Sequence, residues 1–169
     1  MRALGPGSVS SLLKVALDVI FVLLWAALGI LLVAALLALL LPVDLGVWRR
    51  VPADLRGPVL AGGLAGAAVY IAVLLFIIDR VRRIFLTLTA GDPFHPDNVR
   101  RLQAIGFALA ALELISYAIN LTGWVFHELF RWDHSMFNPT AWFAVLVVFV
   151  LAEVFREGAR LRREAELTI

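Results

Sequence analysis

The chain has 169 residues, of which 62% are hydrophobic and 17% are charged, and its net charge is +2. A soluble domain is only about 45–50% apolar, so the excess indicates that lipid is the main solvent of this chain. The small net charge argues against direct binding of nucleic acid. The lack of cysteine excludes disulfides, thiolate metal sites and cysteine nucleophiles. We expect a single membrane domain over 1–169, because no segment outside the apolar blocks could build a core of its own.

Four long apolar segments predict four transmembrane helices, at 15–41, 58–78, 102–124 and 140–155. The first is too long for the apolar part of a signal peptide, which has roughly 7–15 residues, so we expect the mature protein to keep it. Pro42 ends the first helix, and Pro58 and Pro139 suit the first turns of the second and fourth helices. The expected fold is all-α: a four-helix transmembrane bundle whose second and fourth helices extend into the cytoplasm.

Lysine and arginine are distributed unequally between the two sides of this bundle. Eleven of the 15 lie in the N-terminal segment, in the loop 79–101 or in the tail 156–169. The other four lie in the two opposite loops, at Arg49, Arg50, Arg56 and Arg131. Because cytoplasmic loops carry the excess of positive charge, we expect a multi-pass protein of the cell membrane with both termini in the cytoplasm.

The longest polar passage between two apolar segments is 91–106, which reads GDPFHPDNVRRLQAIG. Gly91 and the two residues after it are expected to end the second helix, which runs to about Thr89, and to turn the chain. His95 is the expected N-cap of the next helix, and Pro96 its first residue. This passage and the charged tail carry the most distinctive residues of the predicted cytoplasmic side. We therefore predict a cytoplasmic interaction face made of Asp92, Pro93, Phe94, His95, Asn98, Arg100, Arg101, Glu153, Arg156, Glu157, Arg160 and Arg163.

Glu113 lies about midway through the third segment, where an ionisable side chain costs roughly 2.5–3.5 kcal/mol to insert. Helical spacing places Ser116, Tyr117 and Asn120 on the same face. One hypothesis is a site for a proton, a cation or a small ligand inside the bundle. The other is a protonated carboxyl that hydrogen-bonds a neighbouring helix and has a structural role, as we expect for Asn120.

Two pairs of small residues predict faces where helices pack closely. Gly62 and Gly66 are four residues apart in the second segment, and Gly106 and Ala110 have the same spacing in the third. Small residues at this spacing let two helix backbones approach each other in lipid. The partner is either another helix of the same chain or a second copy in a homo-oligomer.

No combination of residues in the sequence indicates an enzyme. The G-x-S-x-G turn of serine hydrolases is absent, and the glycine-rich passage near Gly62 lacks the Lys-Thr pair of a phosphate-binding loop. His127, Glu128, Asp133 and His134 do not have the spacing of a known zinc motif. We therefore expect neither a cofactor nor a bound metal ion.

Two passages resemble the DUF2975 family of small bacterial and archaeal membrane proteins. One is GDPFHPDNVRRLQAIG at 91–106, where the family shows a G-x-PF turn, an Asn and an R-L-x-x-I-G continuation. The other is EVFREGARLRREAELTI at 153–169, where the family ends in a similar arginine- and glutamate-rich helix. His95 departs from the family, in which a Ser or Thr usually follows the PF pair. The resemblance implies four spans, and a partnership with small helix-turn-helix regulators encoded beside such proteins.

Two functional hypotheses follow. The first is a non-enzymatic regulatory module in the membrane, whose cytoplasmic face binds a soluble partner such as a helix-turn-helix transcription regulator. The alternative is a membrane protein that binds an ion or a small molecule, similar to a transporter, through Glu113.

Overall fold

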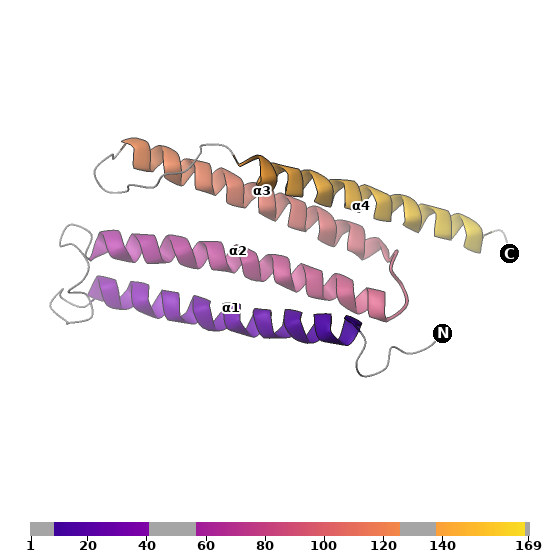
Figure 1. Cartoon of the computed structure of the whole chain (residues 1–169), viewed down its shortest axis with the longest axis horizontal. Coiled ribbons are helices and arrows are strands. Elements are labelled where there is room, and N and C mark those ends of the chain that lie inside the picture. Colours follow the sequence, from indigo (N-terminus) through magenta and orange to yellow (C-terminus); the bar gives the residue numbers. More distant parts are fainter. Residues whose placement is uncertain (1–8, 41–56, 126–137, 168–169) are drawn as a thin grey trace. The chain divides into compact units, whose positions relative to one another are not determined.

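A computed structural model describes residues 9–40, 57–125 and 138–167 of the chain. These residues form helices and no strand, so the predicted all-α class is confirmed. The helices are α1 (Val9–Leu40), α2 (Pro58–Thr89), α3 (Pro96–Val125) and α4 (Pro139–Glu166), as Figure 1 shows.

Proline stands at the first position of three of these helices. Pro58, Pro96 and Pro139 begin α2, α3 and α4, which confirms the predicted starts. Proline suits this position because the N–H that it lacks would have no partner inside the helix. Asn138 caps α4, since its side-chain oxygen accepts a hydrogen bond from the N–H of Ala141 at 3.3 Å.

The chain is a multi-pass membrane protein. Within the described residues, three segments are long and apolar enough to cross a membrane: Leu12–Leu40, Leu60–Thr89 and Pro139–Ala165. In α1, large apolar side chains such as Val22 (65% exposed) and Ile30 (69%) lie open, as lipid-facing residues do. The predicted span 102–124 lies within α3, and its crossing of the membrane stays a prediction.

The chain divides into two compact units. One is Asp18–Phe76, and the other combines Met1–Leu17 with Ile77–Ile169. In the first unit, Gly62 and Gly66 lie exposed on α2, and no described atom lies within 4 Å of a Cβ added at either position. Their role in packing therefore stays a prediction. The second unit contains α3, α4 and the last residues of α2, and it holds the site described below.

α3 and α4 run antiparallel and pack against each other (Figure 1). Near the middle of the pair, the rings of Phe107 and Phe149 meet edge to face, with their centroids 5.2 Å apart. Gly106 is buried beneath Phe149, and a Cβ added there would lie 3.0 Å from two carbons of that ring. The missing side chain thus lets a ring of α4 lie directly on the backbone of α3.

Replacing Gly106 with leucine is expected to destabilise the α3–α4 pair by about 1–3 kcal/mol, because the new side chain needs the space that the Phe149 ring fills. The thermal unfolding temperature of the detergent-solubilised protein measures this. Gly63→Leu is the matched control, since a Cβ at Gly63 meets no described atom within 4 Å. Equal melting temperatures for the two variants would contradict the packing role of Gly106.

Candidate functional site

The end of α2 is fixed by backbone hydrogen bonds around Gly91. The N–H of Gly91 donates to the carbonyl of Leu88 at 3.1 Å, and the N–H of Asp92 donates to the carbonyl of Thr87 at 3.0 Å. This pair of bonds is the Schellman motif, in which the first residue after the helix adopts the left-handed conformation. Gly91 supplies that residue, with φ of +83°. The prediction that Gly91 ends the helix is confirmed.

The start of α3 is fixed by His95, which stands immediately before Pro96. The Nδ1 of His95 accepts a hydrogen bond from the N–H of Asp97 at 3.2 Å, and its carbonyl accepts one from the N–H of Asn98 at 2.9 Å. The imidazole therefore does what a serine or aspartate side chain does at most helix starts. The bond from Asp97 confirms His95 as the predicted N-cap.

Asn98 is the polar centre of this end of the molecule. Its side chain is completely buried. Its amide nitrogen donates to the hydroxyl of Thr87 at 2.6 Å and to the carbonyl of Pro93 at 3.1 Å. Its amide oxygen accepts from Nη1 of Arg101 at 2.9 Å. One side chain thus joins the end of α2, the chain between the helices and the first turns of α3.

Arg101 ties the same region to the backbone of α2. Its Nη1 also donates to the carbonyl of Arg83 at 3.1 Å, and its side chain is 20% exposed. The hydroxyl of Thr87, besides accepting from Asn98, donates to the carbonyl of Ile84 at 2.7 Å. The side chains of Asn98, Thr87 and Arg101 thus bond to one another and to backbone carbonyls. A polar group that is removed from water needs such partners, because burying it without a hydrogen bond is costly.

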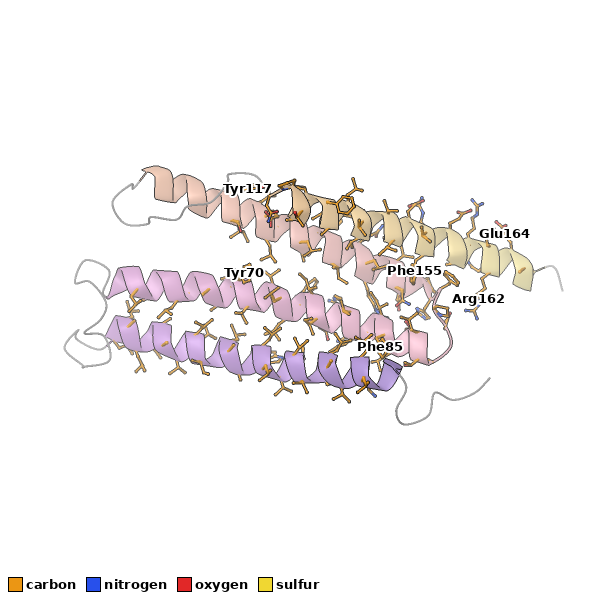
Figure 2. The ribbon with its side chains drawn as sticks, in the orientation of Figure 1. Tyr70, Phe85, Tyr117, Phe155, Arg162 and Glu164 are labelled. Carbon is orange, nitrogen blue, oxygen red and sulfur yellow. The ribbon has the colours of Figure 1, made fainter. Side chains whose placement is uncertain are left out.

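The segment between α2 and α3, residues 90–95, docks on α4, and we call it the turn. The ring of Phe94 lies on Gly158, where an added Cβ would come within 2.5 Å of two ring carbons. The same ring packs on Phe155 with a centroid separation of 5.7 Å. Asp92 forms an ion pair with Arg162. Figure 2 shows Phe155 and Arg162 on the side of α4 that faces the turn, and Glu164 on the opposite side.

These contacts join residues that are up to 70 positions apart in the chain. We call the set the turn cluster, and it consists of Thr87, Asp92, Phe94, Asn98, Arg101, Phe155, Gly158 and Arg162.

The outer surface of α4 carries a ladder of ion pairs. We call residues 153–166 the α4 extension. Along it, Glu153 pairs with Arg156 at 2.5 Å, and Arg160 pairs with Glu157 at 2.8 Å and with Glu164 at 3.4 Å. All five side chains are roughly half exposed or more. Pairs of this kind contribute only about 0.2–1 kcal/mol each, so their partners can be exchanged at little cost.

The twelve residues of the predicted interaction face therefore fall into two groups. Six contact other parts of the protein and hold the turn or the start of α3 in place: Asp92, Pro93, Phe94, His95, Asn98 and Arg101. A second group is exposed: Arg100, Glu153, Arg156, Glu157, Arg160 and Arg163. Arg163 is anchored to its own helix, since its Nε donates to the carbonyl of Ala159 at 3.3 Å.

Sequence reasoning missed Thr87, Gly158 and Arg162 as members of the site. Gly158 had a visible signal, because a glycine inside an otherwise strong helix-forming segment usually has a packing reason. Thr87 and Arg162 had none, because their partners lie 11 and 70 positions away in the chain.

The residues around Glu113 do not form one shared site in the described structure. The hydroxyl of Ser116 donates to the carbonyl of Leu112 in its own helix at 2.9 Å. The hydroxyl of Tyr117 accepts from Nε1 of Trp142 on α4 at 2.8 Å. Glu113 is half-buried and makes no hydrogen bond or ion pair with a described residue. The side chain of Asn120 lies outside the described residues, and the two hypotheses for Glu113 both stay predictions.

Among the described residues, no group of three or more His, Asp or Glu side chains is placed to hold a metal ion. His127, Glu128, Asp133 and His134, which were considered as ligands, lie outside the described residues.

The family model described as "Protein of unknown function (DUF2975)" matches residues 49–169. The match includes α2, α3 and α4, and therefore every residue of the turn cluster. No curated protein and no solved structure is similar enough to the chain to count as a match.

Replacing Asn98 with alanine is expected to destabilise the protein by about 2–3 kcal/mol, because it removes three part-buried hydrogen bonds at once, to Thr87, Pro93 and Arg101. Thermal unfolding of the detergent-solubilised protein measures the change. Gln103→Ala, at an exposed position of the same helix, is the control and is expected to have little effect. An Asn98→Ala variant as stable as that control would show that the buried amide does not hold this region together.

Proposed function

Since the chain belongs to the DUF2975 family and is a multi-pass membrane protein, we propose that it is a non-enzymatic interaction module. The turn and the α4 extension form its binding face, and a soluble regulatory protein is its partner. The observation that carries this proposal is the turn cluster, which fixes three separate chain segments as one platform.

A platform of this kind suits binding, because a surface that is already ordered loses less conformational entropy when a partner docks. The inward-directed hydrogen bonds of Asn98 and Arg101 keep the platform in shape. The exposed charges of the α4 extension supply the contacts. Because their ion pairs are weak, Arg156 and Arg160 can exchange their present partners for acidic groups of another protein.

The side of the membrane and the class of partner are further parts of the proposal. Eleven of the 15 lysines and arginines fall on the side of the turn and the two termini, which supports a cytoplasmic platform. The family resemblance supports a helix-turn-helix transcription regulator as the partner. Holding such a regulator at the membrane would remove it from DNA, so the function is sequestration or signalling.

The protein in detergent is expected to co-purify with a helix-turn-helix regulator encoded beside it. The double variant Arg156→Glu, Arg160→Glu should reduce the amount captured about 10-fold or more, because the two glutamates would repel the acidic groups of the regulator that the two arginines attract. Lys14→Glu, a charge reversal on α1 outside the matched region, is the control and should leave capture unchanged. Unchanged melting temperatures establish that the variants are folded.

Two results would contradict this function. One is a wild-type protein that captures no such regulator. The other is equal capture by the wild type and the double variant.

Reporter fusions test the orientation. An enzyme reporter that is active only in the cytoplasm should be active when it is fused at Met1 and also when it is fused at Ile169, because the positive charge concentrates on that side. The same reporter inserted between residues 43 and 57 should be inactive. Opposite activities at the two ends of the chain would overturn the proposed orientation.

A further inference from the structure

We propose that Asp92 and Phe94 act as an internal latch on α4, and that release of this latch regulates the binding face. The first part stands on the contacts of the turn alone. The second part rests on the proposed function.

The latch lies at the base of a projecting helix. Among the described residues of α4, Val145, Ala152 and Ala159 are buried, and every position with a described side chain after Ala159 is exposed. Phe94, which meets Gly158, precedes the first residue of α3. The part of α4 beyond Gly158 therefore extends past the start of α3, where the turn supplies its tertiary contact.

The contacts that fasten the turn to α4 are few and partly open to solvent. Phe94 is 38% exposed although its ring covers Gly158 and touches Phe155. The ion pair between Asp92 and Arg162 has side chains that are 37% and 47% exposed. A partly exposed ring and a surface ion pair contribute less stability than the buried hydrogen bonds of Asn98, so the contact with α4 is the part of the platform that a ligand can open most easily.

Gly158 lets the Phe94 ring lie directly on the backbone of α4, because a glycine has no side chain in the way. An alanine there would bring its Cβ within 2.5 Å of Phe94, a distance that non-bonded atoms do not adopt, so the ring would have to leave. The surface exposed by this departure combines the glycine backbone, the Phe155 ring and the Arg162 guanidinium. A partner segment fits this surface if it carries an aromatic side chain and a carboxylate close together in sequence, as Phe94 and Asp92 are in the turn. Its ring would pack on Phe155, its carboxylate would pair with Arg162, and it would compete with the turn for α4.

Amide hydrogen exchange of residues 155–165 in the detergent-solubilised full chain tests the latch without any partner. Phe94→Ala and Gly158→Ala should each raise the exchange rates about 10-fold, because both open the same contact. The double variant should exchange no faster than the single ones, since alanine at 158 meets no obstacle once the ring is gone. Gly63→Ala is the control and should leave these rates unchanged.

Rates that stay at the wild-type level in both single variants, or effects that add in the double variant, would overturn the latch. Asp92→Asn provides a second route, because it removes the ion pair without introducing a clash. It should raise the rates by a smaller factor in the same residues, and an unchanged rate would count against the part of the latch assigned to Asp92.

Affinity for the co-purifying regulator tests the regulation. Phe94→Ala should bind it about 10-fold more tightly than the wild type, because the part of the binding face on α4 that the Phe94 ring covers is then open to the regulator. Equal or weaker binding by Phe94→Ala would overturn the regulatory role of the latch. The hydrogen-exchange rates would then decide alone whether the latch itself exists. A regulator that binds neither form would overturn the proposed function together with this regulation, while the exchange rates would still decide whether the latch exists.

Discussion

The buried amide of Asn98 is the interaction on which this end of the protein depends. A side chain with no exposed surface must satisfy its donors and its acceptor within the protein, and Asn98 does so with Thr87, Pro93 and Arg101. Because these partners belong to α2, to the turn and to α3, the chain has one arrangement that satisfies all of them. An apolar residue of similar size could fill the space but could not select that arrangement. The hydrogen bonds of this amide therefore determine how α2, the turn and α3 are arranged at this end of the protein.

A surrounding bilayer accounts for the apolar surface of the membrane-spanning helices. α1 exposes many large apolar side chains, such as Val22 and Ile30, which in water would be an aggregation hazard and in a bilayer is the ordinary state of a spanning helix. In lipid, apolar surface provides no force that brings helices together, so close packing takes its place. Gly106 beneath the Phe149 ring is such a contact between α3 and α4. The protein therefore uses two different means of cohesion, packing within the helix pair and hydrogen bonding at the turn.

Much of the fold could be predicted from local signals in the sequence. Pro58, Pro96 and Pro139 indicated the starts of three helices, Gly91 indicated the end of α2, and His95 was identified as a cap, because each effect acts within one helical turn. The site was predicted only as a surface. Asn98 was expected on an interaction face and is instead fully buried, since burial depends on neighbours that are distant in the sequence. Arg162 and Gly158 were missed for the same reason, because their partners Asp92 and Phe94 are separated from them by more than 60 residues.

The pair of α3 and α4 is fastened at three levels. Tyr117 bonds to Trp142 at one end, Phe107 meets Phe149 near the middle, and Phe94 lies on Gly158 at the other end. Two helices that contact each other at several points along their length cannot slide past each other without breaking all of these contacts. They can tilt or rotate together as one rigid pair. A displacement of the turn would therefore change the angle of the whole pair, at its far end too, and would leave the register between α3 and α4 unchanged.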